Sequence, residues 1–370
     1  MTHYRLTDLV KSLPATVPFV GPETQERSRG GAFRARIGAN ENVFGPSPAV
    51  AEAIAQAASG AWMYGDPENH VLRHALAEHH GVAPDNVMTG EGIDGLLGYV
   101  VRMLVEPGDR VVTSTGAYPT FNYHVVGYDG SLVTVPYRDD CEDLEALLEA
   151  AADQQAKLIY LANPDNPMGT WWGAEVINEM IARVPEGTLL LLDEAYGEFA
   201  EPDTLPEIDV SSESVLRFRT FSKAYGLAGI RVGYVIGESA LVGEFNKVRN
   251  HFGVGRVAQT AALAALEDQD HLALVIDQVK RARVRITEIA LENGLTSLAS
   301  ATNFVTIDCG RDGDFAVAVL ERLVQEGIFV RMPGVAPLNR CIRVTAGLDH
   351  ELDAFAEALP VVLSEVAARR

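Results

Sequence analysis

The sequence predicts an α/β fold, with a mainly parallel seven-stranded sheet in a large domain and a smaller α/β domain towards the C-terminus. Two observations carry this prediction. From Val87 onward, short apolar runs alternate with segments of helical periodicity, the order typical of a sheet layered with helices. The run 189–192 consists of four leucines and is apolar on both faces, as a strand covered by helices on both sides is. The chain of 370 residues, 47% of them hydrophobic, is long enough to bury two cores.

The first 36 residues are expected to form an arm that packs with the small domain. They include several prolines and a basic, glycine-containing stretch from Arg27 to Arg36. The large domain is predicted to span residues 37–265. Near its start, Pro48 marks the beginning of a helix through 49–58, because proline is favoured in the first turn of a helix.

Asn69 is a candidate cap for a second helix, which ends near His80. Seven apolar runs bounded by turn formers are then predicted as strands. A helical stretch with breaks near 252 and 268 leads into the small domain, predicted to span 266–370. The expected strands of the large domain are 87–89, 110–113, 132–135, 158–161, 189–192, 215–219 and 232–236. The small domain is expected to contain strands at 304–307, 328–331 and 342–345, and helices at 315–325 and from 352 onward.

Charge and composition exclude several classes of protein. The net charge of −21 argues against a nucleic acid or an anionic membrane as partner, because phosphate binding needs a basic stripe. Cys141, Cys309 and Cys341 form no CxxC pair, so we expect reduced thiols. No run of 18 apolar residues and no signal-like apolar segment is present. We therefore expect a cytoplasmic protein.

The stretch 220–231, TFSKAYGLAGIR, carries the residues best suited to chemistry. It follows a predicted strand and places Lys223 among hydroxyl groups, glycines and an arginine. A lysine amine is the usual protein partner for a Schiff base with pyridoxal phosphate (PLP). Thr220 and Ser222 can donate hydrogen bonds to its phosphate, and Arg231 can clamp it with two parallel ones. The pattern predicts a cofactor site.

Polar residues also follow two other predicted strands. Ligands of open α/β sheets collect outside the carboxyl ends of the strands, so these residues are expected to meet. Asn166 lies in NPDNPMG, 163–169, whose turns fix an amide side chain. Asp193 ends the leucine run, and a buried carboxylate there either caps the backbone that follows it or meets a cation, such as a pyridinium N–H.

Two further strand ends favour the same kind of ligand. Gly92 lies where a helix opens, and the free N–H groups of a helix start can hold a phosphate. Tyr118 follows the run 110–113 and offers a ring that can lie over a flat cofactor; Phe121 and Tyr123 are alternatives for this contact.

Two other interpretations explain less of the sequence. Glycines at 90, 92 and 95 match the G-x-G-x-x-G pattern of dinucleotide-binding loops, but a nicotinamide enzyme would leave Lys223, Asn166 and Asp193 without a role. His70 and His74 lie four residues apart on a predicted helix, but the glutamate and the third ligand of a zinc site are missing. We expect no metal site.

The motifs NPDNPMG, DEAY and TFSKAYGLAGIRVGY, in this order and spacing, resemble the PLP-dependent aminotransferases of fold type I. Within that group, NENVFGPSP at 40–48 and IRVTAG at 342–347 are similar to the histidinol-phosphate aminotransferase family. The resemblance covers the chain from about Ile37 to the last helix. It implies a cytoplasmic homodimer that moves an amino group between an amino acid or histidinol phosphate and 2-oxoglutarate.

The resemblance implies a role for each matching residue at the cofactor. Lys223 would form the Schiff base and move the proton of the substrate α-carbon, and Asp193 would keep the pyridine nitrogen protonated. Asn166 and Tyr196 would hydrogen-bond the ring hydroxyl, with Tyr118 stacked on the ring. The phosphate would lie at Gly92, Ile93 and Asp94, with Thr220, Ser222 and Arg231.

It also implies residues for the substrate and for the dimer. Arg343 is similar to the arginine that binds the substrate α-carboxylate, and Arg331 to an arginine used for the far phosphate. A surface ion pair is the alternative for Arg331. Asn42 is expected at the substrate as well. Tyr64 is similar to a residue that reaches across the dimer to the phosphate of the neighbouring subunit.

The sequence departs from the family pattern at several positions. Ile93, Gly95 and Met63 replace hydroxylated, acidic and basic residues, and Met168 stands where threonine is common. Trp171 and Trp172 add aromatic bulk after NPDNPMG, although such a pair is more often core packing. These changes leave two alternatives open: an aminotransferase for aromatic or other bulky amino acids, and a PLP-dependent decarboxylase of a phosphorylated amino acid. A non-catalytic PLP-binding protein is disfavoured by the complete set of site residues.

Overall fold

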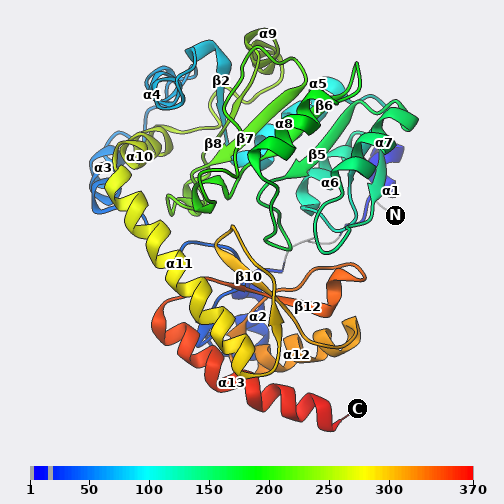
Figure 1. The fold of residues 1–370 in the computed structure, drawn as a ribbon. Coiled ribbons are helices and arrows are strands. Elements are labelled where there is room, and N and C mark those ends of the chain that lie inside the picture. Colours follow the sequence, from blue (N-terminus) through cyan, green and yellow to red (C-terminus); the bar gives the residue numbers. More distant parts are fainter. Residues whose placement is uncertain (1–3, 16–19, 370) are drawn as a thin grey trace.

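The computed structural model describes residues 4–15 and 20–369, which form two layered units connected by the long helix α11 (Gln269–Glu292) (Figure 1). The larger unit contains a seven-stranded sheet of order β2-β8-β7-β6-β5-β3-β4. The neighbours from β7 to β4 pair in parallel, and β8 runs antiparallel to both β2 and β7. The predicted mainly parallel seven-stranded sheet is therefore confirmed. Its strands are β2 (Val87–Gly90), β3 (Arg110–Ser114), β4 (Ser131–Val135), β5 (Leu158–Ala162), β6 (Leu189–Asp193), β7 (Val215–Thr220) and β8 (Gly233–Ile236).

The reversal of β8 decides what gathers at one edge of this sheet. Gly233, the first residue of β8, pairs with Thr220 at the end of β7 and with Gly90 at the end of β2. The connection between β7 and β8 and the start of α5 (Gly92–Leu104) therefore lie at the edge where the parallel strands end. A Cβ atom on Gly233 would come within 2.9 Å of the Gly92 carbonyl carbon and the Ile93 nitrogen, so only glycine permits this approach.

Helices cover both faces of the sheet, as the alternating core residues require. Leu189 and Leu191 of β6 pack in the same apolar cluster as residues of α5 and of α6 (Pro119–Gly127). Leu190 and Leu192 point to the other face and pack with α7 (Leu144–Gln154) and α8 (Ala174–Ala182). Side chains alternate between the faces of a strand, so four consecutive leucines serve both layers.

The smaller unit is built on an antiparallel sheet of order β12-β10-β9, beside α11, α12 and α13. The arm joins it directly, because β1 pairs in parallel with β11 and the Arg36 N–H donates to the Glu351 carboxylate. Residues 1–3 and 16–19 of the predicted arm lie outside the described residues. The elements are α1 (Asp8–Ser12), α2 (Pro22–Arg29), β1 (Ala35–Arg36), β9 (Thr296–Ser297), β10 (Phe304–Asp308), α12 (Gly313–Gln325), β11 (Ile328–Phe329), β12 (Cys341–Thr345) and α13 (Asp349–Ala368).

The remaining helices pack at one side of the large sheet. The predicted capping role of Asn69 is wrong: its φ of 51° is left-handed, and its side chain makes no cap hydrogen bond. Asp66 caps the helix instead, its carboxylate accepting from the His70 N–H at 2.8 Å. These helices are α3 (Pro48–Ala58), α4 (His70–His80), α9 (Ser239–Glu244) and α10 (Arg256–Glu267), and single 3₁₀ turns occur at Pro84–Asn86, Gly197–Phe199, Ala228–Ile230, Phe245–Lys247 and Leu338–Arg340.

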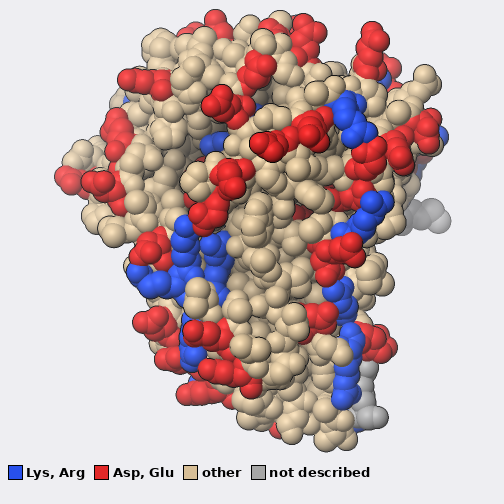
Figure 2. Space-filling model, in the orientation of Figure 1, with Lys and Arg blue, Asp and Glu red and all other residues tan. Residues whose placement is uncertain are grey.

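The surface is dominated by acidic side chains. Figure 2 shows them spread over both units on this face, with the basic side chains in smaller separate groups, in keeping with the net charge of −21. Within residues 4–15 and 20–369, none of the helices combines the length and the apolar character needed to cross a bilayer. The three cysteines are free thiols.

Candidate active site

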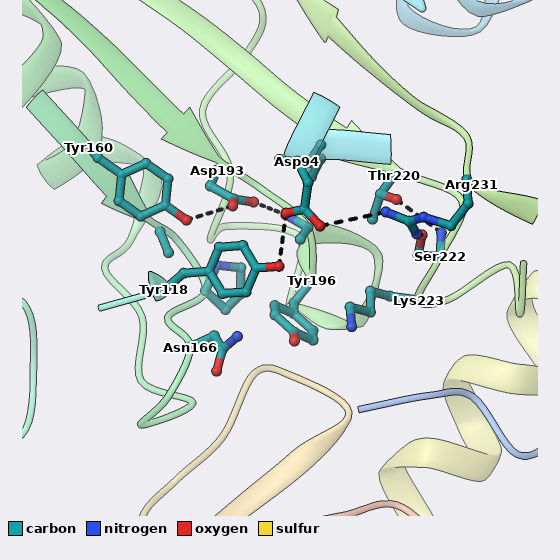
Figure 3. A pocket seen from close by; sticks show the side chains of 14 residues that line it. Asp94, Tyr118, Tyr160, Asn166, Asp193, Tyr196, Thr220, Ser222, Lys223 and Arg231 are labelled. Atoms are coloured by element: carbon teal, nitrogen blue, oxygen red, sulfur yellow. Dashed lines mark hydrogen bonds and ion pairs between the residues drawn. The ribbon is translucent and has the colours of Figure 1, made fainter. Parts of the chain in front are cut away.

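An open pocket with an empty volume of about 540 Å³ lies where the parallel strands end (Figure 3). Its side chains come from the ends of β5, β6 and β7, from the start of α5 and from the connection between β7 and β8. Most of the predicted cofactor residues line it. The lining residues are Ile93, Asp94, Tyr118, Tyr160, Ala162, Pro164, Asn166, Asp193, Ala195, Tyr196, Thr220, Ser222, Lys223 and Arg231.

Lys223 projects into the pocket from a firmly anchored loop. The neighbouring Phe221 and Ala224 are buried, at 0% and 1% exposure. Gly226 has a φ of +69°, and a Cβ atom there would come within 2.7 Å of the Gly45 backbone, so this turn requires glycine. The Lys223 amine donates a hydrogen bond to the Asn40 carbonyl oxygen at 3.1 Å. The amine is thus held at the pocket by backbone that is itself fixed.

One end of the pocket is suited to a phosphate group. The first turn of α5 offers the free N–H groups of Gly92, Ile93 and Asp94, and an unpaired helix start attracts anions. Arg231 lies over this turn: its guanidinium donates to the Ser222 hydroxyl at 3.1 Å and lies 3.6 Å from the Asp94 carboxylate. A Cβ atom on Gly92 would lie 2.5 Å from the Arg231 guanidinium, so glycine keeps this space open.

Asp193 lies at the other end of the pocket and is 5% exposed. Its carboxylate accepts hydrogen bonds from the Tyr160 hydroxyl at 2.7 Å and from the Ala195 N–H at 2.9 Å, both uncharged donors. Burial raises the pKa of Asp193 to about 6, and the charge of Lys223 opposes this rise in part. A cationic ring N–H next to this carboxylate would supply the missing counter-charge.

Asn166 and Arg343 form a second contact at the pocket. The Arg343 guanidinium, from β12, donates to the Asn166 side-chain oxygen at 2.5 Å. This bond leaves the Asn166 amide N–H groups free to face the pocket. The Arg343 Nε has no hydrogen-bond partner among the described residues, and burial lowers the pKa of the side chain. An anion bound here would satisfy that donor.

Two further predicted residues, Arg331 and Asn42, do not line the pocket. The backbone of Arg331 bridges that of Arg343, which places the two arginines side by side, and the Arg331 guanidinium donates to the Val20 carbonyl oxygen. The surface ion pair considered for Arg331 is absent among the described residues. Asn42 donates to the Ala224 carbonyl oxygen at 2.9 Å, behind Lys223. Whether Asn42 contacts the substrate stays a prediction.

Tyr64 does not line the pocket of its own chain. It is 78% exposed, and its ring packs against Phe252 with centroids 4.8 Å apart, in a surface hollow that Met63 and Arg256 also line. His70 and His74 contact each other through their rings. Among the described residues, no group of three or more potential metal ligands occurs.

Two residues at the site were missed from the sequence. Tyr160 sits inside an apolar strand, where it was counted only as core; its hydroxyl holds Asp193. Asn40 belongs to the motif NENVFGPSP, yet no role was expected for it. It contacts both Lys223 and Tyr196. The contacts of Asn40 are visible only in the folded chain, where residue 40 meets the distant residues 196 and 223.

The residues present fit PLP. A buried carboxylate without a charged partner, a lysine amine and an anion cradle line one pocket, and these match the ring nitrogen, the aldehyde and the phosphate of the cofactor. Tyr118 lies between the two ends, and its hydroxyl donates to Asp94 at 2.8 Å. Figure 3 shows Asp193 and Lys223 on either side of the same space.

The chain is similar to known aminotransferases in sequence and in fold. The family model described as "Aminotransferase class I and II" matches residues 36–359. The chain is 34% identical to "Histidinol-phosphate aminotransferase 1" of Bacillus cereus, over 98% of this chain and 97% of the relative. It is 55% identical to the histidinol-phosphate aminotransferase of Sinorhizobium meliloti, solved in complex with pyridoxal-5'-phosphate, with a TM-score of 0.96 and 99% of both chains covered. An aspartate aminotransferase from Thermus thermophilus, at 22% identity and a TM-score of 0.81, shares the fold; the match covers 97% of this chain and 100% of that one.

A buried pair of carboxyl groups supports the loop that carries Asn166. Glu142 and Asp165 are each 2% exposed, and their carboxyl groups interact with each other. Glu142 also accepts from the Ser114 hydroxyl at 2.5 Å, and Asp165 accepts from the Tyr137 hydroxyl at 2.9 Å. Burial raises the pKa of Asp165 to about 7 and raises that of Glu142 well above its usual value. Burial and the uncharged donors around the pair favour its protonated form, and the charge of Arg343 opposes this in part.

Replacing Glu142 by glutamine should make the protein less sensitive to alkaline pH. The folded-state pKa values of the pair lie above the unfolded values of about 4, so its contribution to stability is lost as pH rises from about 4 through about 7. We expect the cofactor-free Glu142→Gln protein to melt near the wild type at pH 5 and several degrees above it at pH 8. Glu149→Gln, at an exposed position of α7, is the control. An equal difference in melting temperature at both pH values would contradict the shared proton.

Proposed function

The chain belongs to the class I and II aminotransferases, PLP-dependent enzymes, and on that premise we propose that it moves the amino group of histidinol phosphate to 2-oxoglutarate. The observation that carries the choice of substrate is the pair of neighbouring arginines, Arg331 and Arg343, beside Asn166 and Lys223. Histidinol phosphate has no carboxylate, so its phosphate is the anion these arginines must take. The acceptor, 2-oxoglutarate, would place its α-carboxylate at Arg343, whose Nε has no partner among the described residues.

Each end of the pocket has one task in this proposal. When bound, PLP supplies an aldehyde that condenses with amines and a ring that accepts electrons from the substrate α-carbon. Asp193 holds the ring nitrogen protonated, which keeps the ring electron-accepting. Ser222, Arg231 and the first turn of α5 hold the phosphate group by charge and hydrogen bonds.

Lys223 is the general base and acid. Its amine would hold the cofactor aldehyde in the resting enzyme and, once freed, would take the proton of the substrate α-carbon at Nζ and later give up that same proton. The Asn40 carbonyl oxygen, 3.1 Å from this amine, keeps it at the pocket meanwhile. Asn166 and Tyr196 orient the ring from one side, and Tyr118 limits its movement from the other.

Of the sequence departures that left an aromatic or bulky donor open, Ile93 lines the pocket, but Met168, Trp171 and Trp172 lie elsewhere. Met168 is fully buried in a small cluster with Leu338 and Cys341, and Trp172 donates its ring N–H to the Glu142 carbonyl oxygen. Neither these residues nor Trp171 line the pocket. This supports a phosphorylated donor over an aromatic one.

We propose a homodimer in which Tyr64 reaches the phosphate end of the neighbouring pocket. In support, Trp62 and Tyr64 are 82% and 78% exposed, and Phe252, which packs on Tyr64, is 49% exposed. Three large rings on one surface are unusual for a face in contact with water. The cytoplasmic location stays a prediction.

Absorption spectroscopy tests the proposed reaction in a single half-turnover. We expect the purified protein with PLP to be yellow, and its visible band to bleach with histidinol phosphate at least about tenfold more efficiently than with phenylalanine or tyrosine. Lys223→Ala should retain cofactor and lose turnover. Bleaching by an aromatic amino acid alone would favour the first alternative, and release of carbon dioxide without an oxo product would favour the decarboxylase.

A variant of Arg331 should affect the binding of the two substrates differently. We expect Arg331→Gln to raise the KM for histidinol phosphate by about tenfold to a hundredfold, the loss of one charged hydrogen bond, and to change that for 2-oxoglutarate by less than about threefold. Arg311→Gln, an arginine that packs on Phe315, is the matched control. Equal effects on both substrates would contradict the role of Arg331 as the phosphate ligand.

A further inference from the structure

Asn40 connects three parts of the active site. It is 2% exposed and has a φ of 56°, a left-handed conformation that asparagine tolerates better than most residues. Its carbonyl oxygen accepts from the Lys223 amine at 3.1 Å and from the Asn303 amide at 3.2 Å. Its side-chain N–H donates to the Tyr196 hydroxyl at 2.9 Å. Asn40, the first residue of the motif NENVFGPSP, thus contacts both Lys223, the proposed base, and Tyr196, which is proposed to lie beside the cofactor ring.

Thr345 fixes which way the Asn40 amide faces. The Thr345 hydroxyl accepts from the Asn40 backbone N–H at 3.1 Å and donates its own proton to the Asn40 side-chain oxygen at 3.1 Å. With that oxygen engaged, the amide N–H must be the group that faces Tyr196. All these atoms are buried, so an amide turned the other way would leave polar groups unpaired.

The orientation of the amide determines the role of the Tyr196 hydroxyl. A hydroxyl that accepts from an N–H has its own proton available for another partner. No acceptor for this proton is found on the described part of the chain, and Tyr196 lines the pocket. The proton therefore points into the pocket. Hydrogen bonds in series also polarise one another, so the Asn40 N–H strengthens Tyr196 as a donor.

We propose that Asn40 is a positioning residue that commits the Tyr196 hydroxyl to donating its proton to the ring oxygen of the cofactor. The inference rests on the proposed place of Tyr196 beside that ring. A hydrogen bond donated to the ring oxygen reduces the negative charge on that oxygen. This charge would otherwise favour a proton on the neighbouring nitrogen of Lys223, so the hydrogen bond lowers the pH at which the visible band changes. Asn40 sets this midpoint through Tyr196, without contacting the cofactor itself.

The test is a double-mutant cycle read from the visible spectrum of the holoenzyme. Asn40→Gly removes the side chain and keeps the left-handed backbone and its carbonyl oxygen, so the contact with Lys223 survives. Tyr196→Phe removes the donor. We expect Tyr196→Phe to raise the pH midpoint of the visible band by about one unit and Asn40→Gly by about half a unit, the scale of one hydrogen bond. The double variant should match Tyr196→Phe alone.

The variant Thr345→Val tests the same proposal independently. It leaves the Asn40 side chain in place and removes the hydroxyl that orients it, so we expect a smaller shift in the same direction. An unchanged midpoint in Asn40→Gly, or a shift that adds in full to that of Tyr196→Phe, would overturn the role of Asn40 alone. An unchanged midpoint in Tyr196→Phe would overturn the proposed place of Tyr196 and the inference with it.

Discussion

The antiparallel pairing of β8 with β2 and β7 is the constraint on which the rest of the site depends. It brings the first turn of α5 and the β7–β8 connection to the edge where the parallel strands end. Gly233 has no room for a side chain, because a Cβ atom there would lie 2.9 Å from the backbone of Gly92 and Ile93. The pairing of these strands therefore places the helix start proposed for the phosphate and the loop that carries Lys223 at the same edge of the sheet.

Within this frame, the charge of Asp193 has no partner of its own. Burial raises the pKa of its carboxyl group to about 6, and its hydrogen-bond donors, Tyr160 and Ala195, are uncharged. The opposite end of the pocket has a guanidinium and a helix start that attract anions. A ligand with a cationic ring nitrogen and an anionic phosphate satisfies both ends. Tyr160 and Asn40 hold Asp193 and Tyr196 in place for it.

The sequence was sufficient for the sheet and for the residues that directly follow its strands. Apolar runs and turn formers are local signals, and they located all seven strands. The cap at Asn69 was wrong: its backbone is left-handed, which no local pattern revealed, and Asp66 accepts from the His70 N–H in its place. The contacts of Asn40 join positions 40, 196, 223 and 345, and Tyr160 looked like core. Such contacts depend on which distant segments meet in the folded chain, and the local patterns of a single sequence do not predict this.

The central claim, that Asp193 acts as the counter-charge of the ring nitrogen, is tested most directly by the kinetics of Asp193→Asn. Asparagine keeps the shape and can still accept from Tyr160, but it cannot hold the nitrogen protonated. The account predicts a yellow protein that retains PLP and loses at least about a hundredfold in kcat, because a charge interaction used in the transition state is gone. Activity within about threefold of the wild type, with PLP bound, would contradict it.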